Sequence, residues 1–176
     1  LMFRNYGYRS GVTQTMRAHL QALAVQAQGM FPDRVLRVLD IGANDGTLLN
    51  ALEWGEKYAI DPSDVPAPSY LDSGIMYTRG FFPQDLPAVW PNFHLIFTIA
   101  CFYDADDPVG FATAVRDRLA WDGLWCCEVA DAGKMARLGG WDAICFEHLL
   151  YLEAETFEQI CRLAGLTVIR RERNDC

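Results

Sequence analysis

A glycine-containing turn with acidic residues on both sides is the part of this sequence best suited to ligand chemistry. Gly42 and Gly46 follow an apolar run at residues 35–41, and Asp40 and Asp45 flank the turn. Continuous apolar runs of this length are typical of parallel strands covered on both faces, and glycine lets the backbone bend sharply beside a ligand. The pattern therefore predicts a strand, a ligand-binding turn and the beginning of a helix.

The charges of this turn indicate which kind of ligand it binds. The dinucleotide fingerprint G-x-G-x-x-G has its middle glycine where this chain has Asn44, and the two flanking carboxylates would repel a pyrophosphate. S-adenosylmethionine has an adenosine and a cationic sulfonium but no phosphate, so it fits this turn. One alternative to an S-adenosylmethionine site is a strand, turn and helix that bind no ligand, as in any α/β protein. A more distant alternative is the NAD site of an oxidoreductase.

A second carboxylate follows at a distance that suits ribose binding. Asp61 ends an apolar segment at residues 57–61, about twenty residues after Gly42, where nucleoside-binding α/β folds place an acid that accepts from ribose hydroxyls. Further along, Phe81 and Phe82 suit stacking on adenine, with packing under a loop as the alternative. The expected cofactor contacts are Asp40, Gly42, Asn44, Asp45, Gly46, Asp61, Pro62, Phe81, Phe82 and Ala100.

The elements that position these residues alternate between strands and helices. This order predicts an α/β fold, a Rossmann-like, doubly wound and mostly parallel sheet of about six strands. A helix is expected from Thr13 to Gly29, with His19 off its apolar stripe and at the surface. The expected strands are residues 35–41, 57–61, 74–78, 93–100, 124–129 and 166–171, and the later helices are 47–54, 109–119 and 154–164.

Composition limits the partners of the chain. With 176 residues, 51% of them hydrophobic, the chain can bury one substantial core, and its net charge of −8 argues against nucleic acid as the main partner. We expect no membrane span, because no apolar stretch reaches about 18 residues. The six cysteines form no C-x-x-C pair, so no metal site is indicated and a reducing, cytoplasmic location is expected. The expected partner is a small-molecule substrate.

Several stretches resemble a known family of enzymes. The D-x-G-x-x-x-G pattern at residues 40–46 resembles motif I of class I S-adenosylmethionine-dependent methyltransferases. Residues 8–16, 102–108 and 141–149 resemble three segments of the sugar C-methyltransferases that act on nucleotide-activated 4-keto deoxysugars: the segment leading into the catalytic domain, the loop after its fourth strand and its active-site segment. The resemblance implies transfer of a methyl group from S-adenosylmethionine, with S-adenosylhomocysteine as product.

The resemblance also implies a domain organisation. Residues 1–30 would lead into the domain, and residues 31–176 would form the catalytic domain of a longer protein. The family has a cysteine-rich zinc domain before this region, and a seventh strand and a further domain after it. A sheet without its seventh strand would leave an edge at which another chain could pair to form an oligomer. The small-molecule substrate implied by the resemblance is a nucleotide sugar.

The catalytic residues are implied by the resemblance alone. The family usually has Tyr-His-Glu-His where this chain has Cys-Phe-Glu-His at residues 145–148, so the tyrosine and the first histidine are absent. Glu147 and His148 carry over as the acid–base pair, in which His148 would take the proton α to the ketone and Glu147 would hold the substrate. The alternatives are an O- or N-methyltransferase on another small metabolite and a non-catalytic domain that binds S-adenosylmethionine.

Overall fold

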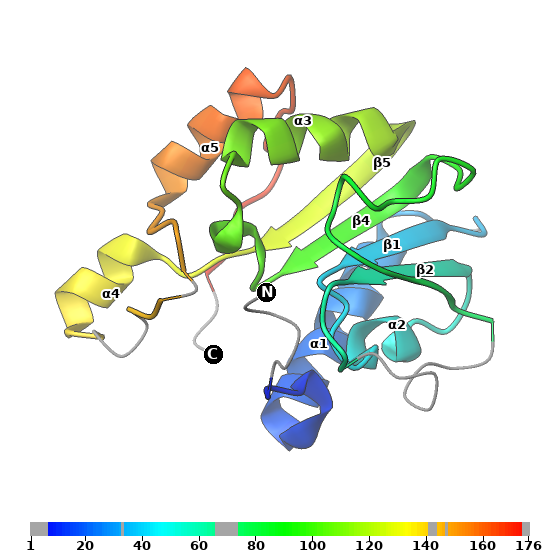
Figure 1. The fold of residues 1–176 in the computed structure, drawn as a ribbon, viewed down its shortest axis with the longest axis horizontal. Helices are drawn as coiled ribbons and strands as arrows, with labels where there is room; N and C mark the ends of the chain where they lie inside the picture. The colour runs from blue at the N-terminus through cyan, green and yellow to red at the C-terminus, as the bar shows by residue number, and fades with distance from the viewer. Residues whose placement is uncertain (1–6, 33, 66–73, 141–143, 147, 174–176) are drawn as a thin grey trace.

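A five-stranded parallel sheet forms the centre of the fold (Figure 1). The computed structural model describes residues 7–32, 34–65, 74–140, 144–146 and 148–173. The strand order is β3-β2-β1-β4-β5, and each neighbouring pair runs in parallel. This order confirms the predicted Rossmann-like fold. The strands are β1 (Arg37–Ile41), β2 (Glu56–Asp61), β3 (Met76–Arg79), β4 (Phe93–Ile99) and β5 (Leu119–Glu128).

Helices cover both faces of this sheet (Figure 1). Helices α1 (Gln14–Gly29) and α2 (Thr47–Ala51) pack on one face, and α3 (Pro108–Arg118) and α5 (Ala154–Leu163) pack on the other. The remaining elements are α4 (Ala132–Leu138) and the 3-10 turns η1 (Ser10–Val12) and η2 (Phe102–Asp104). Helix α4 lies in a region that the sequence pattern left irregular.

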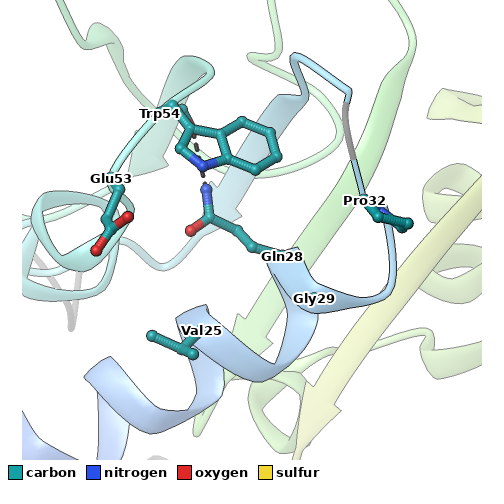
Figure 2. Close-up of a pocket in the computed structure, with 6 residues that line it drawn as sticks. All are labelled: Val25, Gln28, Gly29, Pro32, Glu53 and Trp54. Atoms are coloured by element: carbon teal, nitrogen blue, oxygen red, sulfur yellow. Dashed lines mark hydrogen bonds between the residues drawn. The ribbon is translucent and has the colours of Figure 1, made fainter.

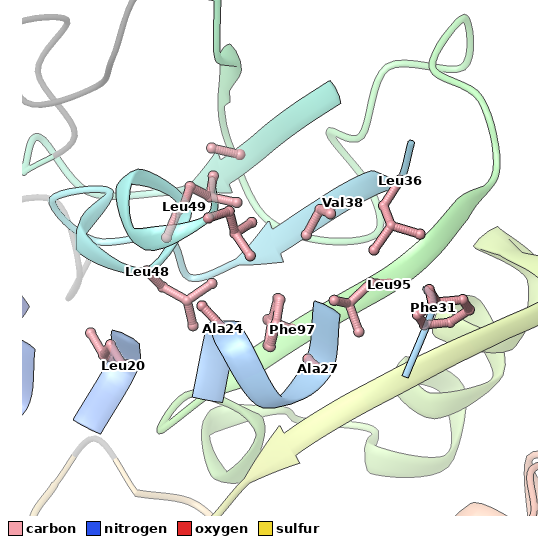
Figure 3. Close-up of a cluster of buried hydrophobic side chains, with 13 residues drawn as sticks. Leu20, Ala24, Ala27, Phe31, Leu36, Val38, Leu48, Leu49, Leu95 and Phe97 are labelled. Carbon is pink, nitrogen blue, oxygen red and sulfur yellow. The ribbon is translucent and has the colours of Figure 1, made fainter. Parts of the chain in front are cut away.

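The apolar pattern of the strands explains the two faces. Val38 packs in the core beneath α1 and α2, whereas its neighbour Leu39 packs in the core on the other face. Successive strand residues point to opposite faces, so a strand covered on both sides must be apolar at nearly every position. Figure 3 shows Ala24 of α1 beside Phe97 of β4 in the first of these cores.

Helix α1 begins and ends where the sequence indicates. The hydroxyl of Thr13 accepts a hydrogen bond from the main-chain N–H of Met16 at 3.2 Å, which is the N-cap arrangement. The helix runs to Gly29, as expected. Helix α2 is shorter than predicted and ends at Ala51, because Leu52 is already extended.

The predicted strand at residues 166–171 is not formed. Leu166 is half-buried, but Val168 and Ile169 are exposed, and the stretch has no strand pairing within the described chain. Arg171 instead pairs with Glu155 and Glu158 of α5, at 3.4 and 3.2 Å. An apolar stretch becomes a strand only when a neighbouring strand supplies hydrogen bonds and a face to cover, and here neither is present.

A buried histidine at the amino end of β4 predicts acid sensitivity of the fold. Nδ1 of His94 accepts from the main-chain N–H of Arg37 at 2.9 Å, and burial, followed by the charge of Arg37, lowers the pKa of His94. The unfolded chain therefore binds a proton at higher pH than the folded chain does. The resulting stability is fully present above about pH 6.5 and is lost as the pH falls through the folded pKa.

We expect a His94→Asn variant, whose amide oxygen can replace Nδ1 as acceptor, to lose less stability than the wild type on acidification. Thermal unfolding between about pH 5 and pH 8 measures this difference. Parallel pH curves for the two proteins would show that His94 does not contribute to the acid response.

Candidate active site

The turn after β1 has the backbone conformation that its glycines indicate. Gly42 and Gly46 have positive φ angles of 74° and 77°, in the left-handed region that favours glycine. A Cβ atom at Gly42 would lie 3.0 Å from Sγ of Cys101, so a side chain there would meet both strain and a close neighbour. The N–H of Gly42 donates to the carbonyl of Ile60 at 2.9 Å, which holds the turn at the carboxyl edge of β1 and β2.

Asp61 is buried at the end of β2 and is bonded to this turn. Its Oδ2 accepts from the main-chain N–H of Asn44 at 2.8 Å, and its Oδ1 accepts from the N–H and the hydroxyl of Ser63 at 2.8 and 2.5 Å. Each carboxylate oxygen can accept more than one hydrogen bond, so the group keeps capacity for a ligand hydroxyl. Asp61 therefore orders the glycine turn and presents an acceptor beside it.

Asp40 is a second buried carboxyl group at this edge. It is 3% exposed at the end of β1, and its side chain makes no hydrogen bond within the described part of the chain. Burial, followed by the charge of Asp61, raises the pKa of Asp40 well above its usual value. A cationic ligand would offset both effects, so this pair of acids suits a positive group.

We expect Asp40→Asn to have opposite effects on the stability of the ligand-free protein and on its affinity for a cationic ligand. Because the folded pKa of Asp40 is raised, ionising this group costs stability, and that cost grows as the pH rises through the folded pKa. The variant should therefore gain stability relative to the ligand-free wild type as the pH rises, while its affinity for a cationic ligand falls about 10-fold to 100-fold. Thermal unfolding and calorimetry with S-adenosylmethionine measure the two effects, and equal affinities would remove Asp40 from the site.

The side chain of Asn44 fastens the segment before α1 onto the turn. Its Oδ1 accepts from the N–H of Ser10 at 3.0 Å, and its Nδ2 donates to the carbonyl of Tyr8 at 3.1 Å. Asn44 itself has a φ of 51°, a conformation that asparagine tolerates better than most residues do. These bonds join residues more than thirty positions apart, and no local sequence signal predicts them.

Asp45 makes the same connection. Its Oδ2 accepts from the N–H of Gly11 at 2.8 Å, and its Oδ1 accepts from the hydroxyl of Thr47 at 2.6 Å, at the beginning of α2. The carboxylate thus orders the helix start and the preceding segment. The side chains of Asn44 and Asp45 together hold residues 8–11 over the turn. Direct contact of these two residues with a cofactor remains a prediction.

The other predicted cofactor contacts lie around the same edge. Phe82 is buried and packs against Phe111 at 5.0 Å between ring centroids, so it belongs to the core, whereas Phe81 is 45% exposed after β3. Phe81 is therefore the aromatic ring of this pair that remains accessible for stacking. Pro62 is half-buried directly after Asp61, and Ala100 is exposed directly after β4, with a φ of 55°.

His148 lies beside the loop that follows β4. Its ring centroid is 4.2 Å from that of Tyr103, and the carbonyl of Tyr103 accepts from the N–H groups of Leu149 and Leu150. Tyr103 belongs to η2, immediately beyond the carboxyl end of β4, so His148 is at the same edge of the sheet as the glycine turn. The predicted partner Glu147 lies outside the described residues.

His19 is not the surface residue that the helical pattern indicates. Its Nε2 lies 2.7 Å from Oε2 of Glu128 at the end of β5, and its side chain is 12% exposed. The two residues are 109 positions apart, so the sequence alone could not pair them.

A cavity of about 260 Å³ lies away from this edge (Figure 2). Its lining residues precede β1 and β2 in the chain, so it is at the amino end of the strands, opposite the glycine turn. Gln28 donates to the carbonyl of Trp54 across it at 3.0 Å. The lining residues are Val25, Gln28, Gly29, Pro32, Glu53 and Trp54.

Neither a metal site nor a membrane-spanning helix is found in the described ranges. These residues contain no group of three or more His, Cys, Asp or Glu side chains placed to hold a metal ion. None of the helices in the same part of the chain has the length and apolarity required to cross a bilayer.

A doubly wound sheet with a glycine turn and two buried acids at its carboxyl edge is typical of nucleoside-binding α/β proteins. The chain belongs to the methyltransferase domain family, whose model matches residues 8–171. No curated protein matches the chain in sequence.

Solved structures share the fold. The plantazolicin methyltransferase BpumL, in complex with a desmethyl analogue and SAH, has a TM-score of 0.67 at 16% identity, over 88% of this chain and 65% of that chain. A chain in the Haloferax volcanii complex that contains the Trm112 methyltransferase activator has a TM-score of 0.71 at 22% identity, over 89% and 73%. A possible histamine N-methyltransferase from Thermotoga maritima has a TM-score of 0.63 at 18% identity, over 85% and 72%. This chain thus spans 65% of the length of the BpumL chain.

Proposed function

We propose that the protein is a methyltransferase that uses S-adenosylmethionine to methylate a small molecule. The observation that carries this proposal is the buried pair Asp40 and Asp61 beside the left-handed turn at Gly42. Burial, followed by the charge of Asp61, raises the pKa of Asp40, so the site disfavours a diphosphate and favours a cation.

The described residues fit this methyl donor. Asp61 would accept from the ribose hydroxyls, Asp40 would face the positive end, and Phe81 would lie against the adenine. The turn requires glycine at position 42, because its φ is 74° and a Cβ there would lie 3.0 Å from Sγ of Cys101. When bound, the donor supplies an electrophilic methyl group on a sulfonium. Membership of the methyltransferase domain family and the SAH-bound structures of BpumL support this assignment.

The acceptor that we propose is a nucleotide-activated 4-keto deoxysugar, methylated at the carbon beside the ketone. His148 would take the α proton, and Glu147 would help to hold the substrate. The position of His148 against Tyr103, at the carboxyl edge, supports its access to an acceptor. Residues 8–16 and 102–108, which carry the resemblance to the sugar enzymes, lie at this edge as well.

Transfer to oxygen or nitrogen is the second candidate. It is favoured by Cys145 and Phe146, which stand where the sugar enzymes have a tyrosine and a histidine. Phe146 is 87% exposed and cannot donate or take a proton.

Proton exchange separates the two candidates. The protein would be incubated with a nucleotide-activated 4-keto deoxysugar in D₂O, and the α proton would be followed by NMR, before methylation is read by mass spectrometry with S-adenosylmethionine. C-methylation predicts deuterium at the α carbon and a product heavier by one methyl group. Binding of S-adenosylmethionine without exchange would reject the keto-sugar acceptor and leave O- or N-methylation.

A further inference from the structure

The end of β5 carries a carboxylate–imidazole pair that the proposed function does not use. Nε2 of His19 and Oε2 of Glu128 are 2.7 Å apart, within the range of charge-assisted hydrogen bonds. The side chains are 12% and 27% exposed, so the pair is sheltered from bulk water but not sealed.

The pair lies at the ligand-binding edge of the sheet. Glu128 is the last residue of β5, and its carbonyl accepts from the N–H of Ala100, just beyond β4, at 3.0 Å. The glycine turn and Asp61 occupy the ends of β1 and β2, on one side of β4. The ends of β4 and β5 are therefore the adjoining part of the same edge, where an acceptor would lie next to the methyl donor.

The pair also shares a face of the sheet with Asp40. Leu124 and Cys126 of β5 pack against the core beneath α1, and the two-residue period of a strand places Glu128 on that face as well. Burial raises the pKa of Cys126 to about 11, and the charges of Glu128 and then Asp40 contribute to the shift. Both carboxylates consequently lie near this thiol, on the side of the sheet that α1 covers.

One nitrogen of the His19 ring remains available. The bond to Glu128 is the one hydrogen bond that His19 makes within the described residues, so Nδ1 has no partner there. An ionised carboxylate only accepts, so Nε2 must carry the hydrogen of this bond, and Nδ1 also carries a hydrogen when the ring is an imidazolium. Packing of α1 does not need such a pair, because Leu20, Ala24 and Ala27 already bury the helix against the sheet.

We propose that His19, as an imidazolium oriented by Glu128, donates a hydrogen bond from Nδ1 to the ketone oxygen of the acceptor. This inference rests on the proposed keto-sugar function and adds the group that stabilises the enolate. His19 is the catalytic residue of the pair because it would touch the substrate, and Glu128 is a positioning residue.

The step balances with His148 as the base. His148 takes the α proton, and the electron pair of the broken C–H bond moves onto the ketone oxygen, which accepts from Nδ1–H of His19. The α carbon then bonds to the donor's methyl carbon while the carbonyl re-forms. Sulfur keeps the electrons of the broken S–C bond, and the proton on His148 passes to solvent. Donors placed where negative charge develops are among the largest contributions to catalysis.

The test is deuterium exchange of the 4-keto deoxysugar in D₂O, without the methyl donor, for variants of both residues. His19→Phe keeps a ring but removes the donor, and we expect exchange at saturating sugar to fall about 100-fold, with little change in the half-saturating concentration. His19→Gln keeps an N–H donor and should recover about a tenth of the wild-type rate or more, and Glu128→Gln should fall about 10-fold. Gln21→Ala, an exposed change on the same helix, is the matched control.

The outcomes separate the two proposals. Thermal unfolding and calorimetric affinity for S-adenosylmethionine must match the wild type, which shows that the variants fold and bind the donor. If His19→Phe exchanges the α proton at the wild-type rate, the catalytic role of His19 is rejected and the proposed function is unaffected, because a packing role needs only the ring. Absence of exchange in the wild type itself would reject the keto-sugar acceptor and, with it, this role of His19.

Discussion

Replacing Asp61 by alanine is expected to lower the affinity for S-adenosylmethionine at least about 100-fold. The variant loses the acceptor for two ribose hydroxyls, and hydrogen bonds to a charged group contribute about 1.5–3 kcal/mol each. It also removes the acceptor of the Asn44 N–H, so the glycine turn loses one of its connections to the end of β2. Isothermal calorimetry on the wild type and the variant measures the difference.

Two further variants make this result specific. Asp61→Asn keeps the size of the side chain and should retain part of the turn geometry, yet it loses the charge and should still bind at least about 10-fold more weakly. Asp64→Ala removes a nearby acid that is 52% exposed and paired with Arg79, and it should bind like the wild type. Equal losses in the Asp61 and Asp64 variants would indicate a general effect of negative charge rather than a ribose contact.

Replacing His148 by alanine is expected to lower turnover about 100-fold to 10,000-fold, the usual range for loss of a general base. Affinity for S-adenosylmethionine should not change, because His148 lies against Tyr103, after β4, whereas the two acids expected to hold the donor, Asp40 and Asp61, lie at the ends of β1 and β2. The measurement is the rate of methyl transfer together with calorimetry for the donor.

The matched control for this prediction is His94→Asn. It alters a histidine at the amino end of β4, opposite the site, so turnover at neutral pH should be preserved. Turnover in His148→Ala within about threefold of the wild type would exclude His148 as the base. Slow transfer with a weakened donor affinity would instead indicate a role in holding the cofactor.

The sequence was sufficient for the parts of the fold that depend on local pattern. The apolar run at β1 predicts a strand buried on both faces, and it is one, with Val38 and Leu39 in opposite cores. The positive φ angles at Gly42 and Gly46 follow equally directly from residue type. Asp61 was placed beside this turn by its distance along the chain, and the structure joins the two through Asn44.

What the sequence could not predict are contacts between distant residues. Asn44 and Asp45 are predicted as ligand contacts because they stand in the turn. Their side chains also accept from the N–H groups of Ser10 and Gly11, which only the folded chain brings close to them. The sequence predicts His19 at the surface because the apolar pattern of a helix carries no information about a contact with a distant strand, here with Glu128 at the end of β5. Residues 166–171 are predicted as a strand because of the apolar residues among them. Their pattern does not show whether a neighbouring strand is available to pair with them, and a strand requires one.

The central claim is that the acidic turn after β1 binds a sulfonium nucleoside rather than a diphosphate coenzyme. Calorimetry of the wild-type chain with S-adenosylmethionine and, separately, with NAD tests it most directly. We predict binding of S-adenosylmethionine with a dissociation constant of about 100 μM or tighter, and no measurable binding of NAD at about 1 mM. Binding of NAD, or no heat from S-adenosylmethionine at the same concentration, would contradict the account.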